Sequence, residues 1–288
     1  MLNSVTQLQF ANSSWSNIRL NQGWFISWLV MLAALAGTIT QVDEDTGVLS
    51  AVLRSVSSNK VLWICLGIAF WHLQRLRSAP LGWLDMFAAI PAIAFSLFFS
   101  GSLAWGGLLF SLILFSRLKP FGASQAGLWI AIASSSQVLV TTILSQLGGD
   151  GLLRLEAQMV GLLAQPFVGE LTVQGSALLG AQGHTLVLVW GCSAFSNLGF
   201  SMLLFFALIT LRFSEKTISQ QKIWMAGYFL LVSMAVVAIN LARLSLMMGG
   251  PEFFEYMHEG DGSGLVRVIT LGCIALLGFT VSLNEKTS

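Results

Sequence analysis

The sequence predicts an all-α polytopic membrane protein, and three observations lead to that fold class. Hydrophobic residues make up 55% of the 288 positions and charged residues only 9%, with a mean hydropathy of +0.78. Soluble domains carry charges at about a quarter of their positions, so an ordinary soluble domain is excluded. The apolar residues also occur in continuous runs, which favours membrane helices over the alternating strands of a transmembrane barrel.

Eight apolar runs define the expected transmembrane helices. Each approaches the length of about 20 residues that a helix needs to cross a bilayer, although the second and the fourth are short. The expected helices are residues 23–40, 61–73, 81–98, 103–116, 126–146, 186–211, 224–246 and 265–283. No repeat or linker divides the sequence, so we expect a single membrane-embedded domain over residues 1–288.

Lysine and arginine residues lie in alternate loops and predict the orientation of the chain. They are Arg19, Arg75, Arg77, Arg117, Lys119, Arg212, Lys216, Lys222 and Lys286. Short loops rich in these residues stay in the cytoplasm, so both termini are expected there. The other loops are acidic, as at Asp43–Asp45, or rich in glycine, and are expected on the outer face.

Two segments before the sixth expected helix are more than plain outer loops. Residues 149–165 place leucines at helical spacing, with Arg154 and Glu156 between them, which predicts a short amphipathic helix at the membrane surface. Residues 171–189 are rich in Thr, Val and Leu around glycines such as Gly175, which predicts a β-hairpin on the outer face.

Cys192 is expected at the outer end of a transmembrane helix. If the hairpin ends at Trp190, the helix from Ser193 to Leu211 has 19 residues and is about 28 Å long, enough to cross the membrane. Unpaired amide groups and the helix dipole at its N-terminus would then stabilise a thiolate on Cys192. The other cysteines, Cys65 and Cys273, lie inside apolar runs, where a disulfide or a zinc site is not expected.

Arg243 and His258 are expected on the same face as Cys192. Arg243 is the twentieth residue of the helix that begins near Trp224, so about 30 Å of helical rise carries it to the outer boundary. His258 follows in the short outer loop 251–264. A thiol, a guanidinium and an imidazole are the groups of a cysteine acyl-transfer site. The structural alternatives are an apolar packing cysteine, a snorkelling arginine and a solvated histidine.

Four further residues are candidates for supporting roles, namely Asn240, Ser193, His184 and Arg267. Asn240 lies one turn before Arg243, where its amide could orient the guanidinium or a substrate backbone, or form a hydrogen bond that packs two helices. His184 lies on the outer face shortly before Cys192, and Arg267 lies one turn into the last helix. Arg267 is a candidate for binding substrate or lipid phosphate, with a snorkelling anchor as the alternative.

Three motifs resemble those of the exosortase/archaeosortase family of membrane cysteine transpeptidases. They are Gly191-Cys192-Ser193-Ala194, Asn240-Leu241-Ala242-Arg243-Leu244 and His258-Glu259-Gly260-Asp261-Gly262, in this order on successive outer helix ends. The resemblance covers about residues 150–280, the expected catalytic region. The histidine in the third motif is similar to the bacterial exosortase branch, while Ala194 stands where the family usually has glycine.

The resemblance implies a protein of the bacterial cytoplasmic (inner) membrane with its active site on the periplasmic face. Its partners would be the lipid bilayer and secreted proteins with a C-terminal sorting signal, made of a motif such as Pro-Glu-Pro, a transmembrane helix and a basic cluster. Cys192 would cleave the signal through a thioester. His258 would be the general base and acid, and Arg243 would stabilise the thiolate or the oxyanion.

Other classes of protein are less well matched by the sequence. There is no basic tract for nucleic acid and no His-Glu-x-x-His pattern for a metalloprotease, and we expect no cofactor and no metal site. A small-solute transporter usually has polar groups at mid-membrane and repeated halves, and neither is evident. A non-catalytic membrane component of envelope polysaccharide or secretion machinery remains as an alternative.

Overall fold

A computed structural model describes residues 21–39, 56, 59–74, 81–118, 125–180, 183–212 and 222–284. These residues form ten α-helices, one short 3-10 helix and three β-strands. Several charged loop residues used for the predicted orientation lie outside the described residues. They are Arg19, Asp43–Asp45, Arg75, Arg77, Lys119, Lys216 and Lys286.

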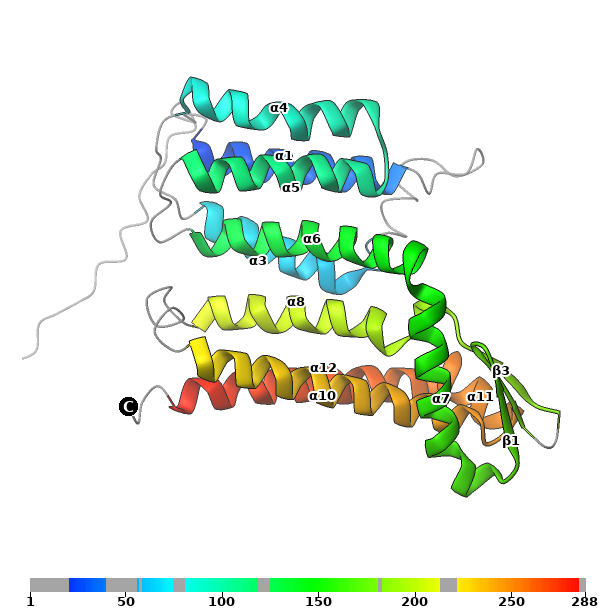
Figure 1. The fold of residues 1–288 in the computed structure, drawn as a ribbon. Coiled ribbons are helices and arrows are strands. Elements are labelled where there is room, and N and C mark those ends of the chain that lie inside the picture. The colour runs from blue at the N-terminus through cyan, green and yellow to red at the C-terminus, as the bar shows by residue number, and fades with distance from the viewer. Residues whose placement is uncertain are drawn as a thin grey trace, which may run out of the picture.

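Eight apolar helices run side by side and form the body of the molecule (Figure 1). They are α1 (Gln22–Ile39), α3 (Lys60–Gln74), α4 (Trp83–Phe98), α5 (Ser102–Leu118), α6 (Gln125–Leu147), α8 (Ala194–Arg212), α10 (Lys222–Met247) and α12 (Asp261–Asn284). Their bounds lie within a few residues of the expected helices, with one exception. The expected helix over residues 186–211 begins only at Ala194, because the residues before it form a strand and a tight turn.

Four of these helices are long and apolar enough to cross a membrane. They are Gln125–Leu147, Ala194–Leu211, Trp224–Met247 and Asp261–Val281. The apolar parts of α1, α3, α4 and α5 are shorter, at 10–17 residues. The chain is therefore an all-α protein with four candidate membrane-spanning helices among the residues that the structure describes.

Two close contacts in the helical body depend on single residues. One is a glycine in α6, and the other is an aspartate that caps the start of α4. A Cβ atom on Gly127 of α6 would lie 2.7 Å from the carbonyl oxygen of Ala69 of α3, so only glycine permits this approach. Asp85, at the start of α4, is fully buried and accepts hydrogen bonds of 2.8 Å from the Gln22 amide and the Gly82 backbone. Asp85 is thus a helix cap that also joins α4 to α1.

Helix α7 (Gly149–Val168) crosses one end of the helical body (Figure 1). One face is buried against the C-terminal helices and contains Leu153, Ala157, Val160 and Ala164. The opposite side exposes large apolar residues, namely Leu155, Met159, Leu162, Leu163 and Phe167. The helix is three residues longer than expected, and an apolar exposed face is the character of a helix that rests on a membrane surface.

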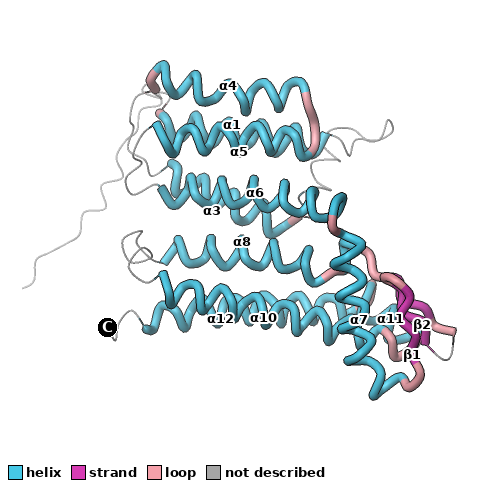
Figure 2. Tube along the Cα trace, in the orientation of Figure 1, coloured by secondary structure: helices cyan, strands magenta, loops and turns pink. Residues whose placement is uncertain are grey.

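A small antiparallel sheet lies at the same end as α7 (Figure 2). Its strands are β1 (Leu171–Gln174), β2 (Ala177–Gly180) and β3 (Thr185–Val187), in the order β1-β2-β3. Gly175, with a φ of +64°, forms the tight turn between β1 and β2. The sequence predicted a β-hairpin over residues 171–189, and the structure has three strands in this segment, the last of which, β3, leads into the turn that carries Cys192.

Candidate active site

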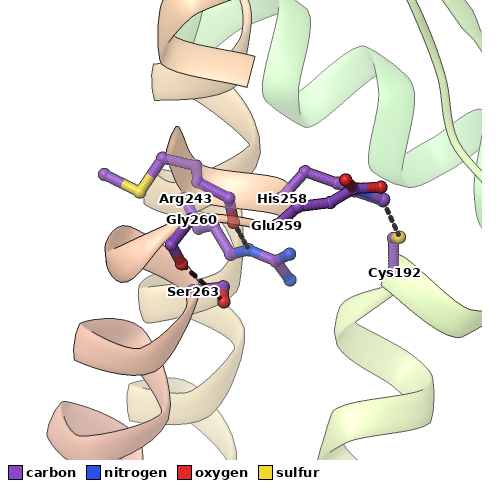
Figure 3. A network of polar contacts seen from close by, with 7 residues as sticks. Cys192, Arg243, His258, Glu259, Gly260 and Ser263 are labelled. Atoms are coloured by element: carbon purple, nitrogen blue, oxygen red, sulfur yellow. Dashed lines mark hydrogen bonds and ion pairs between the residues drawn. The ribbon is translucent and has the colours of Figure 1, made fainter. Parts of the chain in front are cut away.

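Cys192 lies between the sheet and the candidate membrane-spanning helix α8. The short 3-10 helix η2 (Trp190–Cys192) reverses the chain after β3, and α8 begins two residues later. The Cys192 side chain is half-buried, and its Sγ lies 3.9 Å from Nε2 of His258, which is 66 positions away in the sequence (Figure 3). This distance is that of a long hydrogen bond to sulfur, and such contacts are often long before substrate binds.

The backbone amide groups around Cys192 are occupied, which corrects one sequence prediction. The amides of Cys192 and Ser193 donate to the carbonyl oxygens of Val189 and Trp190, at 2.9 and 3.1 Å. The next amide, of Ala194, donates to Oε1 of Glu156 at 2.7 Å. The expectation that unpaired amides stabilise a Cys192 thiolate is therefore wrong for these three groups. Stabilisation of negative charge at this point falls to side chains.

A buried polar network fixes the backbone of Cys192. Asn240 of α10 donates from Nδ2 to the carbonyl oxygen of Cys192 at 3.0 Å and to Oε1 of Glu156 at 3.2 Å. Its Oδ1 accepts a hydrogen bond from Asn197 of α8 at 3.0 Å. Glu156 and Asn240 are only 1% and 3% exposed. The network joins α7, α8 and α10 next to Cys192. Of the two roles predicted for Asn240, these contacts correspond to the hydrogen bond that packs helices.

Glu156 is the residue of this site that the sequence prediction missed. The sequence prediction counted it among the polar residues between the leucines of a surface helix, but its carboxylate caps the N-terminus of α8. The sequence did contain a signal for its burial. Glu156 lies three residues after the apolar Leu153 and four residues before the apolar Val160. It therefore lies on the apolar face of α7. A carboxylate on an apolar helix face predicts a buried partner.

Removal of the Glu156 acceptor is expected to destabilise the protein. Glu156→Leu leaves the Ala194 amide buried without a partner, which lowers the free energy of unfolding by about 1 to 3 kcal/mol. Glu156→Gln retains the Oε1 acceptor and replaces Oε2, which has no hydrogen-bond partner among the described residues, so the loss is less than about 1 kcal/mol. Thermal unfolding in detergent, followed by a thiol dye on the buried Cys65 in a Cys192→Ala/Cys273→Ala background, measures both variants. Equal stability of the Leu and Gln variants would contradict the capping role.

His258 is held by aromatic and glycine contacts at the end of α11 (Pro251–His258). Its ring stacks on Phe254 with centroids 5.0 Å apart and an interplanar angle of 10°. A Cβ atom on Gly262 would lie 2.7 Å from the Tyr256 ring, so glycine is needed where α12 starts against α11. The second ring nitrogen of His258, Nδ1, lies 3.6 Å from Oε1 of Glu259, an exposed carboxylate. This distance permits an electrostatic contact but exceeds that of a good hydrogen bond.

Arg243 of α10 also reaches the site. Its Nε donates to the carbonyl oxygen of Met257 at 3.1 Å, which ties α10 to the residue before His258. The guanidinium points toward the space between Cys192 and His258 (Figure 3). It interacts electrostatically with Cys192 and has no carboxylate partner among the described residues. Arg243 is thus the permanent positive charge of the site.

A cavity of about 670 Å³ opens beside these groups. Cys192, Asn240, Arg243 and Arg267 all contribute to its lining, together with Asn197 and several serines at the same end. Apolar residues of α8, α10 and α12 continue the lining, namely Phe200, Leu204, Val236, Ile239, Leu271 and Ile274. The thiol therefore faces a space that is polar at one end, large enough for part of a peptide or lipid, and bounded by candidate membrane helices.

The remaining predicted residues support the site rather than line it. Ser193 is buried, and its Oγ accepts a hydrogen bond from the Phe195 amide at 3.1 Å, which stabilises the first turn of α8. His184 donates from Nε2 to the Met247 carbonyl oxygen at 3.0 Å and packs edge-on against Phe254. It thereby braces the ring on which His258 stacks. No cluster of residues suited to a metal ion occurs in the described ranges.

Cys192, Arg243 and His258 thus meet in the structure, from three elements far apart in the sequence. No protein-family model, curated protein or solved structure matches the chain. A thiol in contact with an imidazole, next to a guanidinium that has no carboxylate partner among the described residues, is an arrangement suited to nucleophilic attack on a carbonyl group.

Proposed function

We propose that this chain is a membrane cysteine peptidase or transpeptidase that cleaves the C-terminal sorting signal of secreted proteins. The observation that carries the proposal is the 3.9 Å contact between Cys192 Sγ and His258 Nε2, beside Arg243 and a cavity between apolar helices. The three motifs that resemble the exosortase/archaeosortase family add support. A transmembrane sorting signal would bring the scissile bond to the membrane boundary, and the position of Cys192 just before the candidate membrane-spanning helix α8 supports a site at that depth.

The chemistry follows from the three side chains. His258 accepts the thiol proton, and the Cys192 sulfur attacks a substrate carbonyl carbon to give a tetrahedral oxyanion. Collapse of this intermediate breaks the peptide bond, and His258 returns the proton to the departing amine of the tail. The acyl group stays on Cys192 as a thioester until water or an acceptor amine or hydroxyl takes it. Arg243 stabilises the oxyanion, because the nearby backbone amides are already paired.

We further propose eight membrane crossings in the bacterial cytoplasmic membrane, with both termini inside and the thiol on the periplasmic face. Of the four shorter helices, α3 and α5 pack on candidate spans and α1 and α4 pack on α5, and the end of α12 lies opposite the sheet (Figure 1). The alternating loop cations set this orientation. The apolar exposed face of α7 would then rest on the outer leaflet.

The orientation predicts which cysteines a membrane-impermeant maleimide labels in intact spheroplasts. In a Cys65→Ala/Cys273→Ala background, Cys192 is expected to react, because its side chain is half-buried at the outer face. Arg117→Cys, at the far end of α5 in a Cys192→Ala version, is expected to react only after the membrane is opened. Labelling of position 117 but not Cys192 in intact spheroplasts would contradict the orientation.

Release of a substrate tail tests the proposed activity. The full chain is expressed with a secreted, tagged protein that ends in a sorting motif, a transmembrane helix and a basic cluster. We expect loss of the tail with the wild-type chain and retention of the tail without it. A chain that assembles in the membrane but never shortens such a substrate would instead fit a non-catalytic component.

Arg243→Gln is expected to lower kcat/KM for tail release by a factor of about 10² to 10³, the usual effect of removing an oxyanion stabiliser. Arg243→Lys recovers only part of this loss, since it keeps the charge but not the planar group bonded to Met257. Arg154→Gln is the matched control, because Arg154 is an exposed cation of α7 away from the cavity. Equal rates for the wild-type chain and Arg243→Gln would exclude an electrostatic role in catalysis.

A further inference from the structure

The cavity beside Cys192 is lined by three cations and by no carboxylate. Lys60 from the start of α3, Arg243 from α10 and Arg267 from α12 all reach it, and no aspartate or glutamate is among its lining residues. The proposed reaction uses only Arg243. Lys60 and Arg267 form no ion pair with any other described residue. Two cations without an assigned role therefore face the same space.

Two of the cations are close enough to act on one another. Arg267 interacts electrostatically with Arg243, and both groups are positively charged. A compact anion between these two guanidinium groups would offset their repulsion. Arginine groups bind phosphate well because their planar donors match its oxygen atoms. The site is therefore suited to a phosphate or another compact anion.

The rest of the cavity is suited to an acyl chain. The apolar part of the lining comes from Phe200 and Leu204 of α8 and from Leu271 and Ile274 of α12. Helices α3 and α12 pack on opposite sides of α8, so the cavity lies across α8 between them (Figure 1). Only 11% of the α12 span is buried, which leaves this wall of the cavity next to the bilayer. An anion that also has an apolar tail can fill both parts.

We propose that this cavity binds an anionic membrane lipid, with its phosphate held by Lys60, Arg243 and Arg267 and an acyl chain along α8 and α12. A lipid is favoured over an acidic peptide because the apolar lining belongs to three candidate membrane spans, and lipid is abundant at that depth. The lipid site requires no peptidase activity, since it rests on the composition of the cavity alone.

The test compares retention of phosphatidylglycerol and phosphatidylcholine by the purified full-length protein in detergent, measured by native mass spectrometry. Wild type is expected to retain phosphatidylglycerol preferentially. Lys60→Gln/Arg267→Gln loses this retention by about fivefold for each cation, or about 25-fold in total. Arg154→Gln/Arg117→Gln removes two exposed cations that do not line the cavity, so it matches the charge change and keeps wild-type retention.

The same measurements on Cys192→Ala protein separate this proposal from the proposed activity, because that variant should keep the lipid while losing cleavage. Equal retention by the two double variants would overturn the lipid site. Glycerol phosphate that binds as tightly as phosphatidylglycerol would show that the apolar wall is not used, and would also overturn it. Unchanged lipid retention with a raised KM for the sorting-signal substrate in Lys60→Gln/Arg267→Gln would assign these cations to the peptide instead.

Discussion

Replacing Cys192 by alanine is expected to abolish tail release, lowering kcat/KM by a factor on the order of 10⁴ or more. The sulfur is the group that contacts the His258 imidazole, and in the proposed mechanism it forms the covalent bond to the substrate acyl group. Cys192→Ser should be almost as inactive, because an alcohol ionises far less readily than a thiol and is not activated by an imidazole alone at this distance. The loss is measured as the initial rate of tail release in proteoliposomes.

Matched controls distinguish a nucleophile from a packing residue. Cys273→Ala changes a half-buried cysteine of α12 that does not line the cavity, and it should keep the wild-type rate. If Cys192 only filled space as a small apolar side chain, both Ala and Ser would be tolerated. Wild-type cleavage by Cys192→Ala protein would therefore end the proposal of a cysteine enzyme.

His258→Ala is expected to lower the rate of tail release by a factor of about 10² to 10⁴, the usual contribution of a general acid and base. The variant leaves the Cys192 thiol without a proton acceptor, since His258 Nε2 is its recorded polar partner. Raising the pH should restore part of the rate, because hydroxide then removes the thiol proton. The measurement is the pH profile of tail release by the wild-type and His258→Ala proteins.

Glu259→Gln is the matched comparison for His258. Its carboxylate lies 3.6 Å from Nδ1 and is 86% exposed, so water screens its effect on the imidazole. We expect a loss of only a few-fold with little change in the shape of the pH profile. If His258→Ala had no greater effect than Glu259→Gln, the imidazole would not be the base of the reaction.

The sequence predicted the helical body well because membrane helices leave a strong local signal. Each apolar run had to be long enough to bury its own backbone, so α6, α10 and α12 could be located within a few residues. The start of α8 was not defined in this way, because the apolar run at residues 186–211 overlaps the segment that the sequence also assigned to the hairpin. Thr185–Val187 continues the apolar run of the following helix, and its pairing with β2 depends on a contact outside the run.

The candidate site was predicted in its main groups but not in its supporting contacts. Cys192, Arg243 and His258 could be assigned to one face from helix length and loop charge alone. The occupied amides of α8 could not, because Ala194 pairs with Glu156 from a helix 38 positions earlier. The same applies to Phe254, whose stacking on His258 depends on the position of α11. Contacts between segments that are far apart in the sequence can be identified only in the folded structure.

Trapping with hydroxylamine tests most directly whether Cys192 forms an acyl-enzyme. In a thioester mechanism, hydroxylamine competes with the natural acceptor for the acyl group on the sulfur. The new C-terminus of the substrate would then be a hydroxamate, heavier than the carboxylic acid by one NH group, and it would be absent with Cys192→Ala. Mass spectrometry that finds only the carboxylic acid at high hydroxylamine, at an unchanged rate of tail release, would contradict a covalent Cys192 intermediate.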